Sequence, residues 1–102
     1  YWPYDFLMQC EHLTDKALEE VSKISDSTLR ASLTERISLE AITAQYLLLS
    51  LHFGKFSTEG YSALIDKFEN NCLNNGVERY AEDTKSLISD KVSTFRARIK
   101  NT

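Results

Sequence analysis

The segment from Ala41 to Phe53 carries more apolar surface than one helix needs to dock on its neighbours. When each residue turns the chain by about 100°, two separate apolar rows run along this segment. One row consists of Ala41, Ala44, Leu48 and Leu51, and the other of Ile42, Tyr46, Leu49 and Phe53. A surface helix of a globular protein buries one such face, so the second row requires a partner of its own. That partner is either the rest of this chain or another molecule.

The length and composition are those of one globular domain. Of the 102 residues, 42% are hydrophobic and 26% are charged, and these fractions are typical of folded proteins. We therefore interpret residues 1–102 as a single domain. The formal net charge of -3 gives no general attraction to nucleic acid or to an anionic membrane.

The spacing of apolar residues predicts an all-α protein with four amphipathic helices. In the first helix the apolar row runs through Phe6, Cys10, Leu13, Ala17, Val21 and Ile24. Gly54 suits the left-handed residue that follows a helix, and Ser57 suits the N-cap of the next one. The expected helices span about residues 3–24, 28–53, 58–74 and 77–100. Short connections favour antiparallel neighbours, so we expect an antiparallel four-helix bundle.

The second helix has an alternative form in two pieces. Residues 32–35, Ser-Leu-Thr-Glu, fit a capping box, in which a serine and a glutamate satisfy the first N–H groups of a helix. A helix that begins at this point would place a break near Ser32.

No group of side chains indicates catalysis, a metal or a cofactor. His12 lies beside Cys10 and Glu11, but spacings of one and two residues direct side chains to different sides of a helix. His52 has no acidic residue or cysteine three or four positions away. We therefore expect a protein that is not an enzyme and that binds neither cofactor nor metal.

We expect a cytoplasmic protein with two reduced cysteines and no membrane span. The longest uninterrupted apolar run is Tyr46-Leu47-Leu48-Leu49, far short of the roughly 18 residues of a membrane helix. Cys10 and Cys72 are too few for a disulfide framework. The predicted helices also place these two residues at heights that differ by about 10 Å, which is too far for a disulfide.

The leading functional hypothesis is a small helical protein–protein interaction module: an adaptor, regulator or inhibitor. The N-terminus is rich in aromatic residues, which often form the central contacts of protein interfaces. The second helix offers a face for a partner or for a homodimer. The predicted contact residues are Ile42, Tyr46, Leu49, Phe53, Trp2 and Tyr4. Two structural alternatives remain open, because the row on the second helix could be internal core and the N-terminal aromatic residues could cover the end of the bundle.

Two other classes of function are also alternatives. A nucleic-acid-binding regulator would use the basic residues near the C-terminus, which are Lys91, Arg96, Arg98 and Lys100. A small-ligand-binding bundle would hold its ligand between helices, near Tyr46, Tyr61 and Tyr80.

Overall fold

The computed structural model describes residues 2–74 and 82–100. Within these ranges the chain is helical and contains no strand, so the prediction of an all-α fold is confirmed. The elements are α1 (Trp2–Val21), α2 (Ser27–Leu51), α3 (Thr58–Glu69), the short π-helix η1 (Asn70–Asn74) and α4 (Glu82–Lys100). The first residues of the fourth predicted helix, 77–81, lie outside the described residues.

The first helix ends earlier than the sequence predicts, because the backbone forms a tight turn after Val21. The N–H groups of Lys23 and Ile24 each donate to the carbonyl three residues earlier, at 3.2 and 3.0 Å. This spacing closes a tight turn instead of extending the α-helix. Asp26 then caps α2, since its carboxylate accepts a hydrogen bond of 3.0 Å from the N–H of Leu29.

The helix α2 is continuous through Ser32, so the alternative of a break at this residue is wrong. Its N-terminus is already satisfied by Asp26. Thr34, in the proposed capping box, donates its hydroxyl to the carbonyl of Arg30 at 2.8 Å. A hydroxyl that bonds to the carbonyl four residues earlier is compatible with a helix interior, so the box sequence does not start a new helix.

The connection between α2 and α3 uses the residues that the sequence indicates. Gly54 has a φ of 81°, a conformation that residues with a Cβ rarely adopt. Ser57 caps α3, because its hydroxyl oxygen accepts a hydrogen bond of 3.0 Å from the N–H of Gly60. The chain therefore reverses sharply between α2 and α3.

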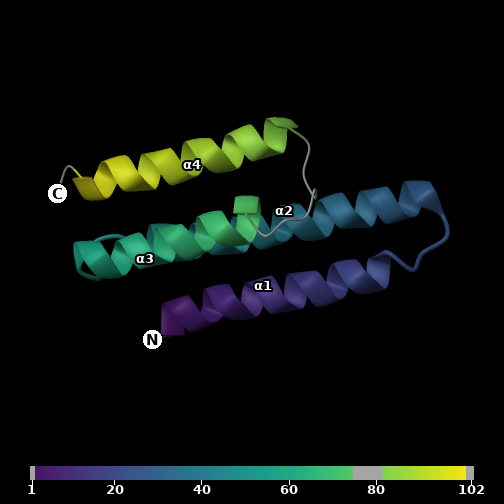
Figure 1. Cartoon of the computed structure of the whole chain (residues 1–102), viewed down its shortest axis with the longest axis horizontal. Helices are drawn as coiled ribbons and strands as arrows, with labels where there is room; N and C mark the ends of the chain where they lie inside the picture. The colour runs from purple at the N-terminus through teal and green to yellow at the C-terminus, as the bar shows by residue number, and fades with distance from the viewer. Residues whose placement is uncertain (1, 75–81, 101–102) are drawn as a thin grey trace.

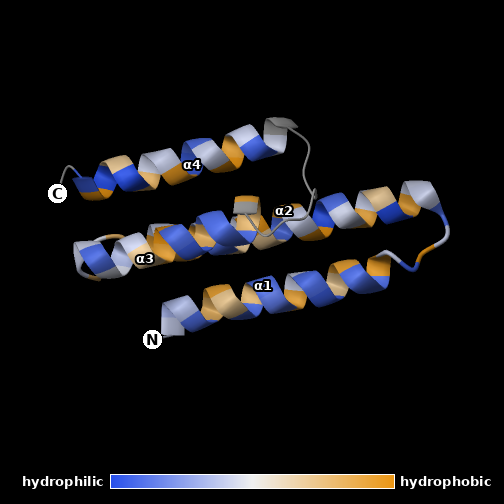
Figure 2. Ribbon diagram, viewed as in Figure 1, coloured by the Kyte–Doolittle hydropathy of each residue, from blue (hydrophilic) through white to orange (hydrophobic). Residues whose placement is uncertain are grey.

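The helices α2 and α3 lie in the middle of the molecule, with α1 and α4 on either side (Figure 1). The helix α1 packs against both α2 and α3, and α4 packs along α3. In Figure 1 successive helices run in opposite directions, and α1 begins at the end of the molecule where α4 ends. Hydrophobic and hydrophilic residues alternate along every helix in Figure 2, as expected for a bundle that buries one side of each element.

The core is centred on aromatic and branched side chains of α2, α3 and α4. Phe95 of α4 contacts three aromatic rings, those of Tyr46, Tyr61 and Phe68, with ring centroids 5.4 to 6.4 Å away. Such tilted and edge-to-face contacts are the favoured geometries of aromatic pairs. The other buried apolar residues of this cluster are Leu7, Ile42, Leu48, Leu49, Leu64, Ile65, Cys72, Ile88 and Val92.

Candidate functional site

The predicted contact row on α2 belongs to the core of the chain itself. Leu49 is 0% exposed and Ile42 is 8% exposed, and both lie in the main hydrophobic cluster. A side chain without exposed surface cannot touch a second molecule while the chain is folded. The structure therefore corrects the interpretation of Ile42 and Leu49 as partner-binding residues, and it favours the alternative that this row is internal core.

The other two members of that row are covered by α4. Tyr46 packs on Phe95, and the ammonium group of Lys91 lies 5.0 Å from the centre of the Tyr46 ring. The guanidinium group of Arg98 lies 4.1 Å from the centre of the Phe53 ring. Cations at these distances are attracted to the negative face of an aromatic ring. Tyr46 and Phe53 are thus half-buried against the chain, and α4 occupies the side that a partner would need.

These contacts also engage the basic residues that define the nucleic-acid alternative. Lys91 and Arg98 lie over aromatic rings, and Arg96 forms ion pairs of 3.0 Å with both Asp66 and Glu69 of α3. Neutralising a phosphate would compete with each of these contacts. Three of the four predicted basic residues therefore already serve the packing of α4.

The first apolar row of α2 behaves differently, because it passes from the core to the surface. Leu48 is buried, Ala41 and Ala44 are half-buried, and Leu51 is 67% exposed. Leu47, four residues before Leu51 and therefore on the same side of the helix, is also exposed. The C-terminal half of α2 thus presents Leu47 and Leu51 to the solvent, and neither belongs to the predicted contact row of Ile42, Tyr46, Leu49 and Phe53.

A second exposed apolar row lies on α1, which packs against α2. Trp2, Phe6 and Leu13 recur at steps of four and seven, so they share one side of α1, and all three are exposed. The ring of Trp2 meets the ring of His52, which follows Leu51, edge-on at a centroid distance of 4.8 Å. This contact places the start of α1 beside the end of α2.

We refer to these five side chains together as the α1/α2 outer face. Its members, each between 38% and 67% exposed, are Trp2, Phe6, Leu13, Leu47 and Leu51. The sequence predicts Trp2 as a contact residue, whereas Phe6 and Leu13 belong to the apolar row that it predicts for the first helix. Leu7, which is 0% exposed, shows that the buried side of α1 is turned away from that row. Periodicity alone does not distinguish the centre of an apolar side from its edge.

The second predicted N-terminal contact residue, Tyr4, lies on another side of α1. It is half-buried and packs against the core, and it lines a groove of about 310 Å³ together with Ala63, Asp66, Lys67 and Asn70. The two N-terminal aromatic residues are therefore not brought together: Trp2 lies on the outer face and Tyr4 between α1 and α3.

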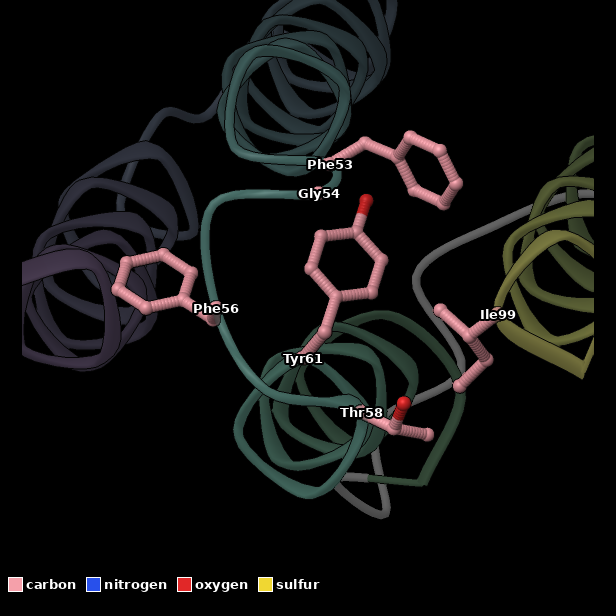
Figure 3. Close-up of a pocket in the computed structure, with 6 residues that line it drawn as sticks. All are labelled: Phe53, Gly54, Phe56, Thr58, Tyr61 and Ile99. Carbon is pink, nitrogen blue, oxygen red and sulfur yellow. The ribbon is translucent and has the colours of Figure 1, made fainter. Parts of the chain in front are cut away.

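A small cavity lies at the end of the bundle, where α2 turns into α3 (Figure 3). Its volume is about 210 Å³, and it is lined by Phe53, Gly54, Phe56, Thr58, Tyr61 and Ile99. In Figure 3 the hydroxyl of Tyr61 points toward α2, where it donates to the carbonyl of Leu49, and Phe56 points toward α1. Ligand sites usually measure about 300–1,000 Å³, so this cavity is small for a metabolite. Tyr80, part of the ligand-binding alternative, lies outside the described residues.

Three polar side chains inside the bundle were not anticipated from the sequence. Ser38, Gln45 and Asn71 are each less than 5% exposed. The amide of Asn71 donates to the carbonyl of Leu7 at 2.9 Å and to the side-chain oxygen of Gln45 at 2.7 Å. One signal was available: Gln45 lies seven residues after Ser38, so both share a side of α2 with buried leucines.

The remaining reactive groups show no assembled chemical site. Cys10 and Cys72 are both free thiols, and burial raises the pKa of the Cys10 thiol. Over residues 2–74 and 82–100, no three side chains of histidine, cysteine, aspartate or glutamate come together in a way that could hold a metal ion. None of the described helices combines the length and the apolar character that crossing a bilayer requires.

Comparisons of this chain with models of protein families, with curated proteins and with solved structures found no match.

Proposed function

We propose that this chain is a small helical protein–protein interaction module whose contact surface is the α1/α2 outer face. The observation that carries the proposal is that five large apolar side chains are exposed on two helices that pack against each other. A fully buried aromatic side chain covers about 150–250 Å², and a leucine covers about 60–120 Å² at about 25 cal/mol per Å². Two aromatic side chains and three leucines that are each roughly half exposed therefore offer about 400 Å². That area lies within the range of about 300–600 Å² found for the largest apolar patch on a typical monomer, and such patches are often functional.

The composition of the face also favours a protein partner. Tryptophan is one of the residue types enriched at binding hot spots, which are surrounded by contacts that exclude water. Trp2 is exposed, and the exposed leucines of the face can supply such surrounding contacts. The face is built on two long helices, so its residues are held in place before a partner arrives. Adaptors, regulators and inhibitors all require a surface of this kind.

The other exposed apolar residues in the described part of the chain do not form a second face of this kind. Four further large apolar side chains are exposed within residues 2–74 and 82–100: Met8 lies five residues before Leu13 and so on another side of α1, Leu29 and Leu39 lie on α2 before Leu47, and Leu87 lies on α4. Single apolar side chains are ordinary on protein surfaces. The two free cysteines are compatible with a reducing compartment, which supports a cytoplasmic site of action.

Site-specific photo-crosslinking in cells of the native source tests the proposal. A photoreactive phenylalanine derivative replaces Leu51 in one variant and Leu87 in a matched control, because both leucines are exposed and lie on different helices. We expect a discrete protein adduct from position 51 that is absent from position 87. Adding Leu47→Asp to the first variant should remove the adduct, because a carboxylate in the centre of an apolar contact loses its hydration without gaining a partner.

Equal labelling from the two positions, or an adduct that survives Leu47→Asp, would contradict the proposed function. Circular dichroism of each variant establishes that the helices are retained, so a lost adduct reports on the surface and not on unfolding.

A further inference from the structure

We infer that the partner of the α1/α2 outer face is a second copy of this chain, related by a two-fold axis that runs parallel to the helices. This inference rests on the proposed function and adds the identity of the partner and the geometry of the complex. In this arrangement α1 of each copy lies against α2 of the other.

The size of the face fits a two-fold dimer. A stable protein interface buries about 800 Å² on each partner, with an apolar centre and a polar rim. The roughly 400 Å² of apolar surface on this face would form the centre, and the charged residues that continue the same two rows would form the rim. In a two-fold interface the same surface meets itself, so it must be complementary to itself.

The charged residues that continue the two rows have opposite signs. On α1, Lys16 and Glu20 follow Leu13 at steps of three and seven, so they lie on the same side of the helix. On α2, Glu40 and Arg36 precede Leu47 at steps of seven and eleven and continue its row. All four charged side chains are exposed.

The contact between Trp2 and His52 fixes the relative height of the two rows. Because α1 and α2 run in opposite directions in Figure 1, each step forward along α1 matches one step back along α2. With a rise of about 1.5 Å per residue, Lys16 lies within about 3 Å of the height of Glu40, and Glu20 within about 3 Å of the height of Arg36.

A two-fold axis parallel to the helices preserves these heights between copies. Lys16 of one copy then faces Glu40 of the other, and Glu20 faces Arg36, while the apolar ends of the two faces meet each other. Within a single copy, Glu20 pairs with Lys23 in the turn after α1, and Arg36 pairs with Glu40 on the surface of α2. Exposed pairs of this kind contribute little, so they can exchange for contacts across an interface.

Molar mass measured by light scattering at micromolar chain concentration tests the inference. We expect twice the chain mass of 11.7 kDa for the unmodified chain and the single-chain mass for Leu51→Glu. The matched control is Leu87→Glu, which adds the same charge at an exposed leucine of α4 and should leave the dimer intact. A single-chain mass for the unmodified protein would overturn the inference, and so would a dimer that survives Leu51→Glu.

A charge exchange tests the direction of the axis. Lys16→Glu and Glu40→Lys should each raise the dissociation constant of the dimer by about threefold to tenfold, because each places like charges opposite one another. The double variant should restore most of the affinity, since it recreates the pair with its signs reversed. A double variant that is weaker than both single variants would exclude this axis.

Failure of this inference is distinguishable from failure of the proposed function. A single-chain mass combined with a crosslink from position 51 to a different protein would remove the second copy and keep the interaction module. If the chain instead forms a dimer through another face, Leu51→Glu would keep the dimer mass in light scattering. The crosslink from position 51 would then be absent.

Discussion

At the residue scale, one buried amide joins three parts of the fold. Asn71 lies in the π-helix η1, is 4% exposed and donates hydrogen bonds to α1 and to α2. A π-helical turn contains an additional residue, which shifts the side chains that follow relative to a regular α-helix. In this chain the shift accompanies a polar contact in the core, where an amide without partners would be costly.

We predict that Asn71→Ala lowers the free energy of unfolding by about 2–3 kcal/mol, because it removes two buried hydrogen bonds and leaves the Gln45 amide without its donor. Gln45→Ala should be similarly costly. Because the two side chains bond to each other, the double variant should lose about 1 kcal/mol less than the sum of the single variants. Urea denaturation of the four proteins measures this coupling, and strict additivity would show that the contact between the amides contributes nothing.

The hydroxyl of Tyr61 makes the stability of the fold depend on alkaline pH. Burial is the main cause that raises the pKa of Tyr61 to about 12, with a smaller opposing effect from the charge of Arg98. Below pH 10 the phenol is protonated in both states. Between pH 10 and 12 the unfolded chain loses this proton while the folded chain retains it, so the free energy of unfolding falls as the pH rises, by up to about 2 kcal/mol.

We therefore expect the urea midpoint to decrease from about pH 10 upward. In Tyr61→Phe this part of the decrease should be missing, although the variant starts from a lower stability because the bond to the Leu49 carbonyl is lost. Parallel profiles for the two proteins across this range would show that Tyr61 titrates equally in both states.

At the element scale, local chemistry predicted the ends of the helices better than it predicted their environment. Gly54 and Ser57 act as the sequence indicates, because a positive φ and an N-cap are determined by one or two residues. The break at Ser32 was a false signal, because a capping box requires a free helix start and Asp26 already supplies one upstream. Which row of α2 faces inward depends on where α1, α3 and α4 pack, and periodicity carries no information about those neighbours.

The contact between α1 and α3 includes an ion pair that is shielded from the solvent. Lys67 and Glu11 are 3.0 Å apart, and their side chains are 14% and 28% exposed. We predict that Lys67→Met, which keeps most of the apolar stem, costs about 1–3 kcal/mol because it leaves a partly buried carboxylate without its partner.

The matched control for this ion pair is Lys23→Met. Its pair with Glu20 has the same length but lies within one exposed stretch of chain, so the loss should stay below about 0.5 kcal/mol. Thermal or urea denaturation of both variants measures the difference, and equal losses would mean that the burial of Lys67 adds nothing to the value of the pair.

At the scale of the whole molecule, the four helices divide the apolar surface of α2 into an inner and an outer part. The inner row, from Ile42 to Phe53, is covered by α3 and α4, whose aromatic rings and cations lie against it. The outer part ends in exposed leucines, and α1, which packs against α2, carries an exposed apolar row of its own. An excess of apolar surface on one helix thus becomes a core on one side and a candidate interface on the other, and this division is the basis of the proposed function.

The most direct test of this division compares Leu49→Asp with Leu51→Asp by circular dichroism during thermal denaturation. The two leucines are two residues apart on the same helix, yet Leu49 is 0% and Leu51 is 67% exposed. We predict that Leu49→Asp loses cooperative unfolding, because a buried carboxylate costs more than about 4 kcal/mol, whereas Leu51→Asp keeps a helical spectrum and a cooperative transition. A folded Leu49→Asp together with an unfolded Leu51→Asp would show that the inner and outer rows have been assigned in the wrong order.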